Sequence, residues 1–189
     1  MSVQYYCAAS LDGYIAEVDD TIDWLTGYEA VPPGGDVSPV EGGYGDFYAK
    51  VGALVSGSVT YEFILGQLER GSEWPYAGKP CWILSSRNLR VPDGDGVDVR
   101  IRNAPVSELS DDMLRSAGEH NLWVVGGGNV ASQFADEGLL DEVLVTVVPV
   151  VLGDGKPLFD RRLPGGPMRL VGVLPRPSGM VELRYEVRR

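Results

Sequence analysis

Cysteine and histidine are scarce in this sequence. Its 189 residues include two cysteines, Cys7 and Cys81, and one histidine, His120. These side chains are too few and too scattered to build a thiolate or imidazole metal centre, so no metal site is predicted. Both cysteines stand in short apolar runs, YYCAA and PCWIL. This setting favours reduced thiols in a hydrophobic core over a structural disulfide.

Long apolar runs are also missing. No stretch approaches the ~18–20 residues that a membrane-spanning helix requires. The first residues, MSVQYYCAASLDG, lack the basic start and the apolar centre of a secretory signal peptide. We therefore expect a cytoplasmic protein that has no membrane partner.

Basic residues are outnumbered by acidic ones. Lysine and arginine total 16, aspartate and glutamate total 27, and the formal net charge is −11. Such a surface repels the phosphates of nucleic acids and anionic membranes, so neither is an expected partner. A small anionic cofactor is still compatible with this charge, because helix dipoles and single cations decide its binding locally.

The composition is that of a globular protein, with 44% hydrophobic and 23% charged residues. The length predicts one domain over residues 1–189. Short apolar runs predict strands, and they alternate with helical segments up to about residue 148. Alternation of this kind predicts an α/β fold with a mainly parallel, twisted sheet of about eight strands and helices on both faces. The strands are expected at 3–9, 53–56, 81–84, 97–101, 122–125 and 141–148, and the helices at 44–51, 57–66, 107–118 and 129–137.

Two further segments depart from this alternation. Residues 17–43 are polar and rich in glycine and proline, which predicts a long loop with one helical turn near 22–25. At the end of the chain, runs 168–174 and 181–187 flank PRPSG and predict an antiparallel hairpin. In the second run Val181 and Leu183 alternate with Glu182 and Arg184, so one face of the hairpin is expected to be exposed to solvent.

Three predicted strands end in turns whose chemistry suits a dinucleotide. Gly57, Ser58 and Thr60 follow the strand at 53–56 and open a helix, where free N–H groups and a partial positive charge attract phosphate. The second turn pairs two hydroxyls with a guanidinium, a combination that can hold an adenosine 2′-phosphate. The second turn consists of Ser85, Ser86 and Arg87. The third turn consists of Gly126, Gly127, Gly128, Asn129 and Val130.

Each turn alone also fits a tight strand–helix connection without a ligand. Three such turns after strands of one sheet favour a ligand, because ligands of open α/β sheets collect outside the carboxyl ends of the strands. An ordinary Rossmann domain is not expected. Only 189 − 128 = 61 residues follow the glycine turn, which is too few for a second mononucleotide half.

Five motifs in order resemble the dihydrofolate reductase superfamily. The similarity is strongest to the branch that contains the reductase domain of the bifunctional riboflavin-biosynthesis deaminase-reductase and its stand-alone relatives. It covers nearly the whole chain. The motifs are AASLDGYIA (8–16), GSVTYE (57–62), LSSR (84–87), WVVGGGNVASQF (123–134) and PVVLGDGKPLF (149–159).

The resemblance implies a dihydrofolate reductase-like fold, NADPH as cofactor and a homodimer. The nicotinamide would lie near Ala8, Ile15 and Ala16, and the turns named above would hold the phosphates. Thr146 matches a position that faces the substrate cleft. These features imply an NAD(P)H-dependent oxidoreductase that passes a hydride to a small heterocyclic or ribosyl-type substrate.

Two departures from the family pattern leave alternatives open. Ser58 stands where the family has arginine, so NADH remains an alternative to NADPH. The substrate carboxylate has no clear match; Asp46 is our candidate, with Glu41 behind it, and a solvated helix position is an equal alternative for Asp46.

Two more residues have double interpretations. Asp12 either meets substrate or makes an Asx turn before Gly13. Trp24 either closes over the ligand or packs the long loop.

Two other functions compete with this reductase. One is a non-catalytic protein that keeps the fold and binds a nucleotide or small molecule. The other is the riboflavin-pathway 5-amino-6-(5-phosphoribosylamino)uracil reductase itself. The latter needs cations for a phosphorylated substrate, and the candidates are few: Lys50, Lys79 and Lys156.

Overall fold

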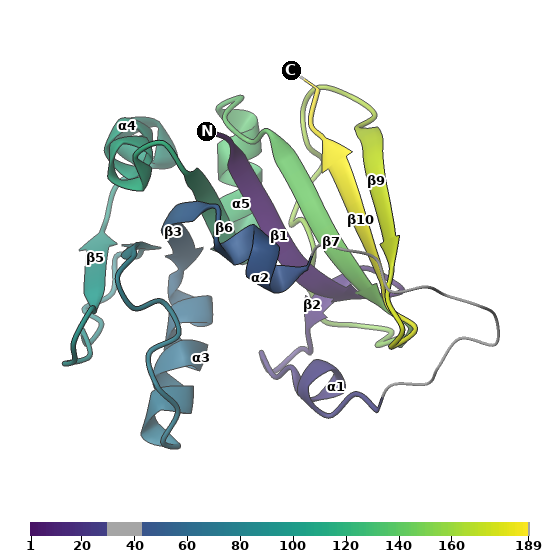
Figure 1. Ribbon diagram of the computed structural model, residues 1–189, viewed down its shortest axis with the longest axis horizontal. Helices are drawn as coiled ribbons and strands as arrows, with labels where there is room; N and C mark the ends of the chain where they lie inside the picture. Colours follow the sequence, from purple (N-terminus) through teal and green to yellow (C-terminus); the bar gives the residue numbers. More distant parts are fainter. Residues whose placement is uncertain (30–42, 189) are drawn as a thin grey trace.

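An eight-stranded sheet organises the computed structural model, which describes residues 1–29 and 43–188 (Figure 1). The strand order is β5-β4-β3-β6-β1-β7-β10-β9. Every pair from β5 to β7 is parallel, and β10 is antiparallel to both β7 and β9. The strands are β1 (Val3–Ser10), β3 (Val51–Gly57), β4 (Pro80–Leu84), β5 (Asp98–Arg102), β6 (Asn121–Gly126), β7 (Glu142–Val148), β9 (Arg169–Pro175) and β10 (Val181–Glu186).

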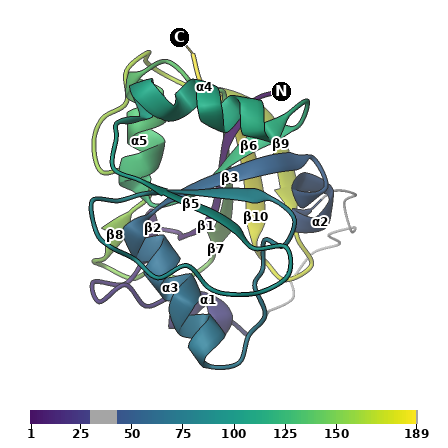
Figure 2. The same cartoon turned by 90° about the vertical axis from the view of Figure 1, so that its left-hand side faces the viewer.

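Helices cover both faces of the sheet, as the alternation predicts. Figure 2 shows α4 (Val106–Ala117) and α5 (Gly128–Asp136) on one side and α3 (Ser58–Glu69) on the other. On α4, Val106, Leu109 and Met113 recur at helical spacing and are buried against the sheet. The short helix α2 (Tyr44–Tyr48) belongs to the α3 side, where it buries Phe47 in a hydrophobic cluster with Leu54, Tyr61 and Trp123.

The predicted α/β fold with a mainly parallel eight-stranded sheet is confirmed, and most predicted elements agree with the structure within a few residues. One helical turn expected near 22–25 is α1 (Asp23–Thr26). The sequence reasoning missed a small second sheet that pairs β2 (Tyr14–Ala16) with β8 (Lys156–Pro157). Both strands are too short to show a pattern of their own.

The C-terminal hairpin corrects one prediction. The alternating pattern of β10 places Glu182 on the face expected to be exposed, yet Glu182 is the only residue of β10 that is classed as buried. The physical reason is pairing, because the Arg176 guanidinium and the Tyr6 hydroxyl both donate to the Glu182 carboxylate and cover it. The exposed edge strand is β9.

Candidate functional site

The three predicted turns meet at one edge of the sheet. Gly57 at the end of β3 pairs with Leu84 at the end of β4, and Ser56 pairs with Gly126 at the end of β6. Because these strands are parallel, their carboxyl ends share the same edge. In open α/β sheets this edge is where ligands bind.

Two helices begin at this edge with glycine at the N-cap. Gly57 precedes α3 and Gly127 precedes α5. Glycine has no side chain that could cap a helix, so no side chain of the N-cap residue occupies the first N–H groups of either helix. Both helix starts therefore offer backbone donors and a partial positive charge to an anion.

Close packing fixes the start of α5. A Cβ atom on Gly128 would lie 2.7 Å from the carbonyl oxygens of both Pro157 and Leu158. The amide of Leu158 in turn donates to the carbonyl of Gly13 at 2.9 Å. The third turn is therefore held against β8 and the segment after β1, which build the opposite wall of the site.

A cleft of about 890 Å³ opens between these elements. Twelve of the residues predicted from the sequence line it. They are Ala8, Ile15, Ala16, Gly57, Ser58, Thr60, Gly126, Gly127, Gly128, Asn129, Val130 and Thr146. The expected cofactor wall and the expected substrate-facing threonine thus share one cavity.

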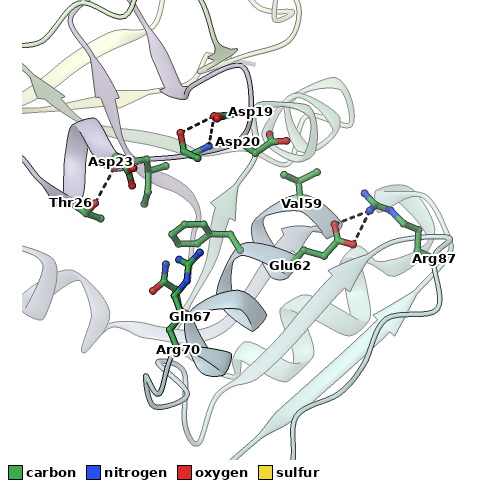
Figure 3. A pocket seen from close by; sticks show the side chains of 12 residues that line it. Asp19, Asp20, Asp23, Thr26, Val59, Glu62, Gln67, Arg70 and Arg87 are labelled. Carbon is green, nitrogen blue, oxygen red and sulfur yellow. Dashed lines mark hydrogen bonds and ion pairs between the residues drawn. The ribbon is translucent and has the colours of Figure 1, made fainter.

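Arg87 lies beside this cleft and does not line it. It lines an adjoining cavity of about 540 Å³ between α3 and the segment that carries Asp19, Asp20 and Asp23 (Figure 3). The Arg87 guanidinium donates to both carboxylate oxygens of Glu62, at 2.9 and 2.8 Å, and to Ser58 Oγ at 2.7 Å. The first two turns are thus joined by one cation.

The two serines of the second turn differ. The Arg87 amide donates to Ser85 Oγ at 3.0 Å, which closes the turn after β4. Ser86 is exposed, and neither serine is among the residues that line the two cavities.

Asp12 makes turn contacts. Its carboxylate accepts from Ser10 Oγ at 2.6 Å and from the amides of Leu152 and Gly153 at 3.2 and 2.7 Å. These hydrogen bonds, chiefly that from Ser10, lower the pKa of Asp12 from 3.8 to about 2. The contacts favour the turn interpretation, and Asp12 does not line the cleft.

Asp46 and Trp24 stand apart from the cavity as well. Asp46 is exposed on α2, and the cleft is lined from that helix by Tyr44 instead. Trp24 is half-buried on α1, whose neighbours Ile22 and Leu25 line the cleft. Glu41, the second candidate for the substrate carboxylate, lies outside the described residues.

Sequence reasoning missed the aromatic end of the cleft. Tyr6, Tyr44, Tyr76 and Trp123 line it together. The ring centroids of Tyr44 and Trp123 are 5.8 Å apart, and those of Tyr76 and Trp123 are also 5.8 Å apart. Strand spacing was the signal that could have identified Tyr6, because it precedes Ala8 by two residues and its side chain therefore lies on the same face of β1.

Charge is sparse in the cleft. Among the lining residues that the structure describes, Lys156 is the only basic one, and its Nζ lies 3.5 Å from Asp20 Oδ1. Lys79 is engaged elsewhere, donating to the Val51 carbonyl at 2.5 Å. Within residues 1–29 and 43–188, no group of three histidine, cysteine or acidic side chains is arranged to hold a metal ion. No helix in the same ranges is long and apolar enough to cross a bilayer.

Known proteins match this chain over most or all of its length. Protein YwjB of Bacillus subtilis (strain 168), itself uncharacterized, is 34% identical over 168 residues, which cover 89% of this chain and 88% of YwjB. A protein from Shewanella sp. PV-4, whose name associates it with riboflavin biosynthesis, has a crystal structure with a TM-score of 0.79 and 28% identity, and all of both chains is covered.

A more distant match concerns the fold alone. Dihydrofolate reductase from Enterococcus faecalis, solved with NADP(H), has a TM-score of 0.57 and 16% identity, with coverage of 100% of this chain and 96% of that one. The family model of the RibD C-terminal domain matches residues 82–181, which run from within β4 through the glycine turn and β9 to the first residue of β10. The chain therefore belongs to the RibD C-terminal domain family, a family of reductase-like domains with the dihydrofolate reductase fold.

Proposed function

We propose that the protein is an NAD(P)H-dependent reductase acting on a small heterocyclic or ribosyl-type substrate. One observation carries this proposal: two glycine-capped helix starts open onto a single cleft, which continues along β1 to an aromatic end. The first part suits linked phosphates, and the second suits planar rings.

The residues present fit a dinucleotide. Gly57 and Gly127 let a diphosphate approach the backbone N–H groups, and the Thr60 hydroxyl is a further donor beside the glycine turn. Arg87 is the cation nearest to these turns and is the candidate for an adenosine 2′-phosphate. Ala8, Ile15 and Ala16 would contact the nicotinamide.

The reduced nicotinamide, when bound, supplies the hydride. The protein's part is orientation and exclusion of water. Small and apolar side chains at Ala8 and Ile15 leave room for one ring, while Tyr44 and Trp123 offer faces for a second ring. These side chains would hold a planar acceptor in the same cleft as the nicotinamide, and the protein would thereby orient the two rings.

A phosphorylated ribosylaminopyrimidine is a less suitable substrate. Its phosphate needs a cation within the cleft, and Lys156 is already paired with Asp20. Among the described residues that line the cleft there is no second basic side chain. We therefore rank the riboflavin-pathway reaction below reduction of an unphosphorylated compound.

A non-catalytic binding protein is the second candidate. The position of Asp46 supports it, because this carboxylate is exposed and outside the cleft. Such a protein would bind nucleotide without turnover. Oxidation of NADPH in the presence of pterins, pyrimidine ribosides, quinones and carbonyl compounds separates the two, since turnover with any of them excludes the binding-only function.

Cofactor binding is tested by titration with NADPH and NADH. Trp123 lines the cleft, so a bound dihydronicotinamide should quench its emission. Gly57→Asp is the decisive variant. The backbone of Gly57 is extended (φ −83°, ψ 171°), which any residue adopts, and aspartate is a good N-cap.

Gly57→Asp should therefore keep or raise the melting temperature while its carboxylate repels phosphate. Gly57→Ser, a smaller cap that carries no charge, is the control. The proposal predicts at least tenfold weaker nucleotide binding for the aspartate than for the serine. No binding of either nucleotide to the wild type at millimolar concentration would refute it.

We also propose the homodimer that the resemblance implies. Leu170 and Val173 on the edge strand β9 are each 50% exposed, which is costly for apolar side chains unless a partner covers them. Light scattering at micromolar concentration tests this. Val173→Lys should shift the mass from dimer to monomer, and a monomeric wild type would refute the proposal.

A further inference from the structure

Glu182 is a buried carboxylate that the proposed function does not use. It lies on β10 and is 3% exposed. A carboxylate at this depth is stable only when it is paired and hydrogen-bonded. The surrounding groups therefore show what its charge holds in place.

Two side chains donate to the Glu182 carboxylate. Arg176 Nη2 lies 2.8 Å from Oε2, and the Tyr6 hydroxyl lies 3.2 Å from the same oxygen. Arg184 Nη2 is 3.8 Å from the other oxygen, Oε1. Arginine neutralises the charge, and the tyrosine is the neutral donor of the cluster.

The sheet register brings this cluster to the substrate end of the cleft. Glu182 on β10 pairs with Thr146 on β7, and Thr146 pairs with Ala8 on β1. The three side chains therefore lie on the same face of the sheet. Thr146 and Ala8 line the cleft, and so does Tyr6.

The direction of the Tyr6 hydrogen bond determines what Tyr6 can recognise. An ionised carboxylate only accepts, so the Tyr6 O–H must donate to Glu182. The Thr146 hydroxyl hydrogen-bonds to the Tyr6 hydroxyl oxygen and occupies one of its lone pairs, and the other is left to accept from another group.

Burial is the largest influence on the pKa of Tyr6 and raises it, ahead of a hydrogen bond with Thr146, which lowers the pKa. The net shift is upward, so the hydroxyl keeps its proton at neutral pH.

The ring of Tyr6 belongs to the aromatic end of the cleft. Its centroid is 4.5 Å from that of Phe47 and 6.4 Å from those of Tyr44 and Trp123. These contacts fix the ring, so the hydroxyl has little freedom to turn away from Glu182.

We propose that the Tyr6 hydroxyl, held by Glu182, is the acceptor that recognises an N–H or O–H group on the planar substrate. The substrate class is therefore a ring that bears a hydrogen-bond donor, such as a lactam or an amino-heterocycle. Glu182 is a positioning residue, since it acts through Tyr6. This inference rests on the proposed function, because it takes the bound ring to be the substrate of the reductase. The affinity for such a ring is measured without cofactor.

The experiment uses two probes of nearly equal shape. Pteridine-2,4-dione carries ring N–H donors at N1 and N3, and 1,3-dimethylpteridine-2,4-dione carries none. Affinities of both are measured by calorimetry, first without nucleotide and then with saturating NADP⁺. The wild type should bind the N–H probe about three- to tenfold more tightly, the range of one net hydrogen bond.

Tyr6→Phe removes only the hydroxyl and keeps the ring in place. This variant should bind the two probes equally, because the N–H probe loses its acceptor. Tyr48→Phe is the matched control, since the Tyr48 hydroxyl donates to the Pro75 carbonyl outside the cleft. It should keep the preference of the wild type.

The Glu182 variants separate positioning from simple stability. Glu182→Gln keeps an oxygen that accepts from Tyr6 and should retain the preference for the N–H probe. Glu182→Leu removes the acceptor, frees the Tyr6 proton and should abolish the preference. A merely structural role would lower the melting temperature of both variants without changing the ratio of the two affinities.

The outcomes are distinct from those of the proposed function. An absent preference in the wild type, no binding of either probe, or a preference that survives Tyr6→Phe overturns the inference. NADPH titration of the same proteins tests the reductase proposal on its own. Failure to bind NADPH refutes that proposal and leaves the probe ratio to decide the role of Tyr6.

Discussion

The pair formed by Arg87 and Glu62 sets a sharp test of cofactor preference. Glu62 pairs with the Arg87 guanidinium, which we propose as the partner of an adenosine 2′-phosphate. Replacing Glu62 with glutamine keeps the shape of the side chain and removes its charge. Arg87 would still be held by Ser58 Oγ at 2.7 Å.

The magnitude follows from exposure. The side chains of Arg87 and Glu62 are 51% and 43% exposed, and ion pairs of this kind contribute about 0.2–1 kcal/mol. Glu62→Gln should therefore tighten NADPH binding by up to about fivefold. NADH lacks the 2′-phosphate, so its affinity should not change. The melting temperature should fall by no more than about 4 °C.

The assay is fluorescence titration of both nucleotides at low and at physiological salt. The gain for NADPH should shrink as salt rises, because exposed charges are screened. Glu69→Gln is the control on the same helix, since Glu69 pairs with Arg90 at 3.6 Å and both side chains are exposed. Equal changes for NADPH and NADH, or a gain in the Glu69 variant, would refute the role of Glu62.

Three further predictions concern stability. The pKa of Asp12 is about 2 in the folded protein against an ordinary 3.8, so the stability that its carboxylate adds is present above about pH 4 and lost as pH falls toward 2. In urea titrations the free energy of unfolding of Asp12→Asn should therefore fall less steeply with acid than that of the wild type, and an equal fall would contradict this. Gly128→Ala should lower the free energy of unfolding by about 1–3 kcal/mol in thermal melts, because its Cβ would press on two carbonyl oxygens. Gly127→Ala is the control, since the nearest atom to its Cβ would be 3.8 Å away, and equal losses for the two variants would count against this packing. Truncation of the fully buried Phe134 to alanine should lower the free energy of unfolding by about 3–5 kcal/mol. A loss of stability as small as that of the exposed Val59→Ala would be inconsistent with the place of Phe134 in the core.

Local signals in the sequence were enough for the fold and for most of the residues that line the cleft. Gly57 and Gly126 follow apolar runs directly, and the conformations they need are properties of a few neighbouring residues. Parallel strands then bring such turns together without further information, as the pairing of Ser56 with Gly126 illustrates. The motif order supplied the family, which the match over residues 82–181 confirms.

Contacts between distant segments could not be read in this way. The ion pair of Glu62 with Arg87 joins a helix to the turn after another strand, and the Tyr6–Glu182 hydrogen bond spans 176 positions. Periodicity was misleading for Glu182, because a charged residue in an alternating strand usually faces water. Its partners Arg176 and Tyr6 reverse that expectation, and neither contact can be read from the residues of β10 itself.

The order in which the strands join the sheet has a consequence for biosynthesis. The outer strand β9 precedes β10 in the chain, yet it attaches to the sheet only through β10. A nascent chain that has emerged as far as Pro175 already contains all three turns at the carboxyl edge of the sheet. It still lacks β10, which carries the Glu182 carboxylate to Tyr6, so this end of the cavity is complete only when β10 has also left the ribosome.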